Sequence, residues 1–245
     1  MPGYLSDELF HFVGNGHAAD HERNYGILTA VLADGCVSHP PHAKGWGTTS
    51  IHSRFSGSLL TEKLFVPTVT CYCDIPAEHL DIHVRKYGLF GLSFDAGLLT
   101  RYGARPVIYV PTRADNDGSP YGTTLLKNVE GIYRGFHQQF MESMPLPPNR
   151  MRALGGIPIS PSTSAREMHN MFIKDFLAFI KPFDSELSDD HPEYYYAERE
   201  WRKYGNLVFE PGNVRRVVVA DGFEHRFATA YPEYASKITV LGAIV

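Results

Sequence analysis

The chain has 245 residues, of which 43% are hydrophobic and 20% are charged, and its formal net charge is −4 at pH 7. This size suits one large domain, or one domain with long insertions. The acidic balance gives no sign of a polybasic surface for nucleic acids or membranes, although it leaves room for a local basic groove. Aromatic residues make up 13% of the chain, and they fill cores or stack on flat ligands such as nucleobases.

The N-terminus and the cysteines favour a cytoplasmic protein. The first residues, MPGYLSDELFHFVGNGH, lack a basic start followed by an apolar run, so no signal peptide is expected. No apolar stretch approaches the roughly 18 residues of a spanning helix. The three cysteines, Cys36, Cys71 and Cys73, are too few for a disulfide framework, which fits a reducing cytosol.

Strand and helix signals follow one another in the first half of the chain. ELFHFV alternates and predicts a strand over residues 9–13. In NYGILTAVLADG the apolar residues have helical spacing, and Gly35 is a natural stop. A polar loop rich in proline, glycine and histidine follows over residues 37–57, and loops of this length are often functional. The next predicted elements are a strand over 69–73, a short helix ending at Gly88, and strands in LFGLSFD and ARPVIYV.

The second half begins with a predicted helical insertion near residues 123–181. A first helix is expected from about 123 to 144, followed by an irregular proline-rich segment. Ser164 and Glu167 then form a capping box, which opens a helix ended by Pro182. Its apolar face would be buried in the core and consists of Met168, Phe172, Phe176, Phe179 and Ile180. Strands in NLVFE, VRRVVVAD and KITVLGAIV complete the order, with one helix before the last of them.

This order predicts a single α+β domain over residues 1–245, with a mixed, split β-sheet flanked by helices. Parallel α/β folds require strands and helices that alternate regularly, and the predicted elements of this chain do not. The chain also lacks the glycine-rich turns of dinucleotide-binding and P-loop folds.

The stretch HPEYYYAEREWRKYG, residues 191–205, carries two glutamates spaced by two. If residues 194–202 form a strand, Glu198 and Glu200 lie on one face with Arg202, while Trp201 faces a core. Two such carboxylates beside tyrosines would suit a cationic transition state. If the segment is a helix, the two glutamates diverge by about 200°. An ordinary solvated charge pattern is the plainer interpretation, and the tyrosine run favours a strand without deciding it.

Several blocks together resemble the AbiGi family of abortive phage resistance proteins. They are LFHFVG, NYGILTAVLADG, VTCYCDIP, KYGLFGLSFD with LLTRYGARPVIYV, and YYAEREWR. The resemblance runs over roughly residues 5 to 240, and its most specific part is the YG-x-FG-x-F…GARPV-x-Y block together with EREWR. The family is described as an antitoxin of an abortive infection system, which implies a cognate toxin or antitoxin protein as partner.

The same order of blocks resembles ADP-ribosyltransferases of the DarT kind. That resemblance implies NAD as substrate, an unidentified nucleic-acid or protein acceptor, and Glu200 as the catalytic glutamate. It matches His11 to the first-strand histidine and Asn24 to the asparagine before the helix. Glu198 would then steer the acceptor. The expected NAD-contacting residues are completed by the rings of Tyr87 and Tyr72, and by Arg54 or Arg85 as the arginine.

Breaking the nicotinamide–ribose bond develops positive charge on the ribose, as glycoside cleavage does. A carboxylate fixed beneath the ribose stabilises that charge, and this is the role expected of Glu200. A tyrosine ring stacks on nicotinamide, and His11 would hydrogen-bond a ribose.

Two other interpretations compete with an NAD enzyme. Cys36, His39 and His42 follow one another at three-residue intervals, and zinc uses such ligands, but no C-x-x-C accompanies them, so loop histidines are the plainer interpretation. The second is a non-catalytic antitoxin or protein-binding module on the same fold, because fold does not establish function.

Overall fold

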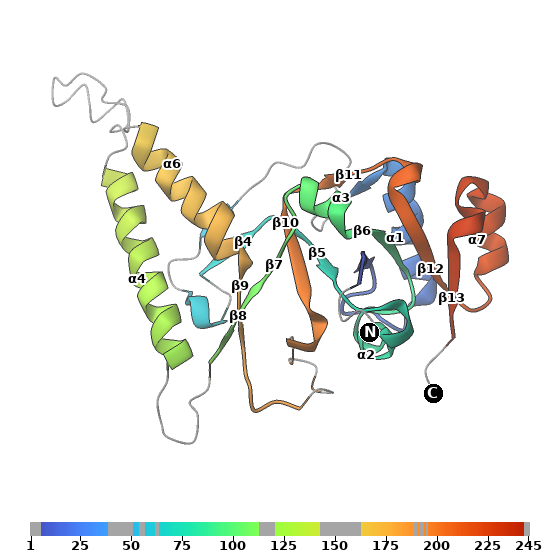
Figure 1. The fold of residues 1–245 in the computed structure, drawn as a ribbon, viewed down its shortest axis with the longest axis horizontal. Helices are drawn as coiled ribbons and strands as arrows, with labels where there is room; N and C mark the ends of the chain where they lie inside the picture. The colour runs from blue at the N-terminus through green and yellow to red at the C-terminus, as the bar shows by residue number, and fades with distance from the viewer. Residues whose placement is uncertain are drawn as a thin grey trace. The chain divides into compact units, whose positions relative to one another are not determined.

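The computed structural model describes residues 6–38, 51–53, 57–61, 64–112, 121–142, 163–188, 191, 194 and 196–242. They form a mixed α+β arrangement whose largest sheet has seven strands (Figure 1), which confirms the predicted class. The chain divides into two compact units, one made of residues 1–51, 67–107 and 187–245, and the other of residues 52–66 and 108–186. The single domain with an insertion near 123–181 stays a prediction. Most of the loop predicted over 37–57 lies outside the described residues.

The first unit contains the seven-stranded sheet. Its strands, in spatial order, are β13 (Ile238–Leu241), β12 (Val214–Ala220), β6 (Gly91–Asp95), β1 (Glu8–Phe12), β5 (Val69–Cys73), β10 (Glu200–Tyr204) and β7 (Arg105–Pro106). β12 and β13 pair in parallel, and the other neighbours pair antiparallel. The strands predicted in ELFHFV, residues 69–73, LFGLSFD, VRRVVVAD and KITVLGAIV are therefore confirmed.

The two faces of this sheet differ in polarity. Phe10 lies opposite Cys73, and Cys73 lies opposite Glu200, so these residues share a face. The same register places Glu8, Ser93 and Arg202 on this face, and all three are buried. The other face is mainly apolar and contributes to the core through buried Leu9, Tyr72, Leu92, Phe94 and Val217.

Helices and a small sheet complete the first unit. α1 (His21–Asp34) begins where the Asp20 side chain accepts a hydrogen bond from the Arg23 amide, and it ends at Gly35, whose φ of 57° is left-handed. This confirms the stop predicted at Gly35. The other helices are α2 (Asp81–Tyr87), which ends at Gly88, α3 (Ala96–Arg101) and α7 (Glu224–Ala230). The two-stranded sheet pairs β2 (Cys36–Val37) with β11 (Leu207–Val208).

The second unit is built around a pair of helices. α4 (Tyr121–Glu142) and α6 (Thr163–Met171) pack together, with the Phe136 and Phe172 rings 5.6 Å apart. Beside them, β8 (Ile108–Pro111) pairs in parallel with β9 (Ile180–Phe183). The short strands β3 (Ile51–Ser53) and β4 (Phe65–Pro67) form another pair.

The predicted helix from Ser164 to Pro182 is wrong at its C-terminal end. α6 stops at Met171, a π-helical turn covers Phe172–Phe176, a 3-10 turn covers Leu177–Phe179, and Pro182 lies inside β9. Pairing with β8 decides this, because it gives residues 180–183 strand partners. The prediction that the apolar side chains from Met168 to Ile180 are all buried is also wrong, since Met168 is 46% exposed. Likewise, ARPVIYV is split between β7, which joins the large sheet, and β8, which does not.

Candidate functional site

The segment with the two glutamates is a turn that runs into a strand. Residues Tyr196–Glu198 form a 3-10 turn, Arg199 has a φ of 45°, and β10 begins at Glu200. The predicted strand over 194–202 is therefore wrong before Glu200. A positive φ takes Arg199 out of the extended region, so the alternation of faces cannot run through it. Tyr195 and the Ala197 side chain lie outside the described residues.

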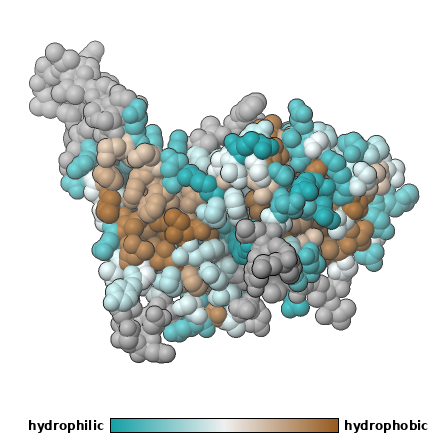
Figure 2. Space-filling view, in the orientation of Figure 1, coloured by the Kyte–Doolittle hydropathy of each residue, from teal (hydrophilic) through white to brown (hydrophobic). Residues whose placement is uncertain are grey.

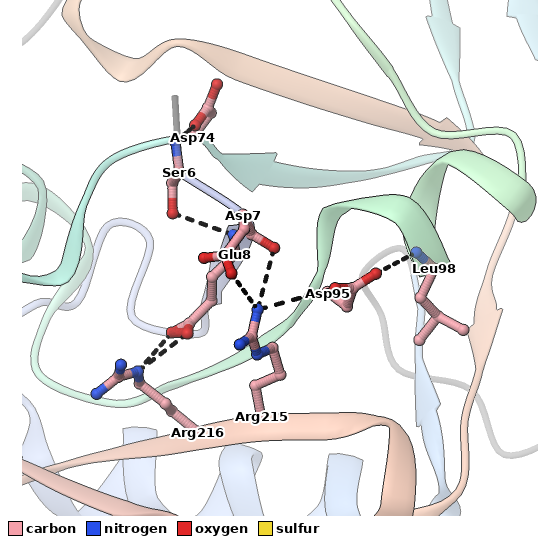
Figure 3. A network of polar contacts seen from close by, with 8 residues as sticks. All are labelled: Ser6, Asp7, Glu8, Asp74, Asp95, Leu98, Arg215 and Arg216. Atoms are coloured by element: carbon pink, nitrogen blue, oxygen red, sulfur yellow. Dashed lines mark hydrogen bonds and ion pairs between the residues drawn. The ribbon is translucent and has the colours of Figure 1, made fainter. Parts of the chain in front are cut away.

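Asp74 holds Arg199 at both its backbone and its side chain. The Asp74 amide donates to the Arg199 carbonyl at 3.2 Å, and an Arg199 guanidinium nitrogen lies 3.0 Å from Asp74 Oδ2. Asp74 Oδ1 also accepts from the Ser6 amide at 3.2 Å (Figure 3). Because an arginine in this conformation costs about 1–2 kcal/mol, the contacts with buried Asp74 help to maintain it.

Glu198 is buried and receives two donors on one oxygen. Lys86 Nζ lies 2.6 Å from Glu198 Oε1, and the Tyr87 hydroxyl donates to the same oxygen at 2.7 Å. Both donors come from the last turn of α2, 111 and 112 residues before Glu198. The structure thus brings together Glu198 and Tyr87, two of the residues that the sequence proposed for one site.

Glu200 forms a second buried ion pair. Arg202 Nε lies 2.7 Å from Glu200 Oε1, and the two side chains are only 10% and 6% exposed. They are two residues apart on β10, so they share a sheet face. Each of the two candidate catalytic carboxylates therefore has a cationic partner within hydrogen-bond distance.

His83 is a buried residue of this region that the sequence reasoning missed. Its ring lies 5.1 Å from the Phe12 ring and 4.5 Å from the Tyr87 ring. Burial, assisted by Lys86, lowers the pKa of His83 to about 3, while Glu200 acts in the opposite direction. The available signal was spacing, because His83 precedes Tyr87 by four residues, which is one helical turn.

His11 and Tyr72 lie on the opposite face of the sheet from Glu200. The His11 ring is 5.8 Å from the Tyr72 ring, and its Nδ1 lies 2.8 Å from the Cys71 carbonyl oxygen. Tyr72 is 2% exposed, and its hydroxyl donates to Thr70. Stacking on a ligand would require the buried Tyr72 ring to be uncovered. The same burial raises the pKa of the Tyr72 hydroxyl.

The Asn24 side chain is bonded within the fold. It is fully buried in α1, and its amide donates to the carbonyl oxygens of His17 and Ala18 at 2.9 and 3.5 Å. These bonds fasten the loop between β1 and α1. Of the two candidate arginines, Arg85 is exposed on α2, and Arg54 lies outside the described residues.

A network of ion pairs joins β12 to carboxylates at the start of β1 (Figure 3). The Arg215 guanidinium lies 3.0 Å from Asp7 Oδ2 and holds the pKa of that carboxyl below its ordinary value. Arg216 Nε lies 2.7 Å from Glu8 Oε1. A register shift between Val214 and Arg216 interrupts the alternation, and both arginines reach carboxylates near the start of β1. The network ties β1 to β12 across β6.

No group of three or more histidine, cysteine, aspartate or glutamate side chains fit to hold a metal occurs within the described residues. Cys36 is described and half-buried, whereas His39 and His42 fall outside them. The zinc alternative that joins these three residues is therefore untested.

The chain is an α+β protein in which two buried carboxylates, each paired with a cation, lie just before and at the start of β10. A comparison with models of protein families shows the family. A model described as "Putative abortive phage resistance protein AbiGi, antitoxin" matches residues 50–235, about three quarters of the 245 residues. The chain belongs to the AbiGi family. The match includes EREWR but begins after LFHFVG and NYGILTAVLADG.

No curated protein and no solved structure matches the chain. The likeness to ADP-ribosyltransferases of the DarT kind therefore stays a prediction. In the described part of the chain, no helix has the length and apolar character needed to cross a membrane.

Proposed function

We propose that this protein is the antitoxin of an abortive infection pair and neutralises a cognate toxin by direct contact. Family membership over residues 50–235 is the observation that carries this proposal. The geometry of the candidate site also supports a non-catalytic role. Glu198 and Glu200 are both buried and paired with cations at 2.6 and 2.7 Å, an arrangement that suits a structural network.

Neutralisation can be tested by growth. Each protein encoded beside this gene is expressed alone in a bacterial host, and then together with the AbiGi-family chain. We expect one neighbour to arrest growth and co-expression to restore it, with the two proteins copurifying as a stable complex. If growth arrest persists although both proteins accumulate, the proposal is wrong.

Glutamate variants separate binding from catalysis in the same assay. Neutralisation by contact should survive Glu200→Gln whenever the variant folds, because the amide keeps the size of the side chain. Neutralisation by a reaction at Glu200 should be lost. Arg226→Gln is a suitable control for charge removal, since Arg226 pairs with Glu22 at an exposed position.

A second candidate function is an NAD-using site of the ADP-ribosyltransferase kind at the same glutamates. It is favoured by the contact of Tyr87 with Glu198 and by the strained Arg199 between the two carboxylates, because backbone strain often accumulates at functional sites. Glu200 would stabilise positive charge on the ribose, and Glu198 would orient the acceptor. In this reaction Glu200 would act either after its ion pair with Arg202 has broken or with Arg202 as its counter-ion.

Calorimetry with NAD tests this second candidate. Binding by the parent protein, weakened in Glu200→Ala, would support an NAD site and justify a search for the acceptor. No binding by either protein at millimolar NAD would exclude it.

A further inference from the structure

We propose that the exposed face of α4 and α6 is a self-association surface that joins two copies of this chain. This inference does not depend on the proposed function. Among the side chains that the structure describes on the helix pair and the π-helical turn, six large apolar ones are exposed: Tyr121, Leu125, Ile132, Met168, Met171 and Phe176. We call them the apolar face. Figure 2 shows hydrophobic surface gathered over α4 and α6.

Aromatic contacts connect the parts of this face. The Phe136 ring of α4 lies 5.6 Å from the Phe172 ring, and the Phe172 ring lies 5.5 Å from the Phe176 ring. Phe136 is one helical turn from Ile132, and Phe172 is one turn from Met168. The exposed side chains therefore flank a half-buried aromatic seam that packs α4 against α6.

The size of the apolar face fits one side of a dimer. If a large side chain has on the order of 200 Å² when fully exposed, the exposed fractions of these six amount to roughly 600 Å². Exposed apolar patches above a few hundred Å² mark interaction sites. A standard interface buries about 800 Å² on each partner, so the apolar face and a polar rim would suffice.

The charge pattern of α4 favours a second copy as the occupant. In a two-fold interface a patch meets itself, so a charged residue near the axis meets its own copy. From Tyr121 to Gln139, one side of α4 carries no charge and consists of Tyr121, Leu125, Asn128, Ile132, Gly135 and Gln139. The amides of Asn128 and Gln139 are both donors and acceptors, so each can pair with its own copy. The charged Lys127, Glu130 and Arg134 lie on the other side of the helix.

One glycine on α4 permits close approach. Gly135 is exposed, and apart from its chain neighbours and the backbone of α4 itself no atom lies within 4 Å of the position that its Cβ would occupy. A second helix can come nearer to the backbone there than at any larger residue. Because Gly135 lies about one helical turn after Ile132, an approaching helix would cover that side chain.

Sedimentation equilibrium of the full chain over a range of concentrations tests the proposal. The parent should sediment as a dimer of the 27.5 kDa chain. Ile132→Lys and Leu125→Lys should each weaken the dimer by at least about tenfold, because each buries an unpaired charge. Both side chains are 51% exposed, so folding should be retained, and circular dichroism checks it.

Lys127→Glu is the matched control. It changes a charge on the same helix, about 140° from Ile132 at 100° per residue, and should leave the association unchanged. A parent that stays monomeric at about 100 µM would overturn the proposal and leave the apolar face to a different protein. Dimers of unchanged affinity in both lysine variants would overturn it equally.

Discussion

Tyr87 and Glu198 are 111 residues apart in the chain, and the tyrosine hydroxyl lies 2.7 Å from the glutamate Oε1. Lys86 Nζ donates a hydrogen bond to the same oxygen at 2.6 Å. The last turn of α2 is thereby fastened to the turn that precedes β10. This contact brings together two residues that the sequence assigned to one site.

Glu198→Gln should destabilise the fold by about 2 kcal/mol, because it leaves the partly buried Lys86 ammonium without its carboxylate. Tyr87→Phe removes one hydrogen bond and should cost about 1 kcal/mol. Urea unfolding measures both changes. Equal stability of Glu198→Gln and the parent would show that the ion pair contributes nothing to folding.

The conformation of Arg199 gives a second prediction. Arg199→Ala and Arg199→Gly both remove the ion pair with Asp74, but only glycine adopts the φ of 45° without strain. Arg199→Gly should therefore be more stable than Arg199→Ala by about 1 kcal/mol. The comparison cancels the lost side chain and isolates the backbone. An alanine variant at least as stable as the glycine variant would contradict the strain at this position.

Local signals in the sequence were sufficient for much of the fold. Gly35 ended α1 as expected, because only the backbone of that residue had to turn left-handed. The alternating residues of β1 and the compact run of β6 likewise lie where their patterns predicted, since each strand has a buried, apolar face.

Contacts between distant residues explain where the sequence failed. Nothing local distinguishes Arg199 from an ordinary strand residue, and its partner Asp74 is 125 residues away. Phe179 and Ile180 have helical spacing with Phe176, yet β8 draws Ile180 into a parallel pair with Ile108. His11 and Glu200 both come from predicted strands, but the register through β5 places them on opposite faces.

Gly14 should not tolerate a side chain. A Cβ at Gly14 would lie 2.2 Å from the Tyr87 carbonyl oxygen and 2.8 Å from the Asn24 amide nitrogen. Gly14→Ala should therefore destabilise the protein by about 2–3 kcal/mol. Gly26→Ala is the matched control, because Gly26 lies in exposed helix with open space around it, and it should stabilise by about 0.5–1 kcal/mol. Similar effects from the two changes in thermal unfolding would contradict the close packing of Gly14.

Acid should destabilise the fold through His83. Burial lowers the pKa of His83 from its ordinary value of 6.5 to about 3. Between these values the unfolded chain binds a proton that the folded chain does not, so stability falls as the pH drops through this window. His83→Phe keeps an aromatic ring beside Phe12 and Tyr87 but cannot be protonated.

Urea unfolding of the parent and His83→Phe at pH 7 and at intervals down to pH 4 measures this effect. Below pH 6 the parent should lose about 1.4 kcal/mol per pH unit more than the variant, which is the cost of one proton. At pH 7 the imidazole is neutral in the folded state and mostly neutral in the unfolded chain, so the difference there reports mainly packing. Other carboxylates and histidines titrate in both proteins, and their contributions cancel in the comparison. Parallel curves would mean that His83 takes up its proton in the folded protein as readily as in the unfolded chain.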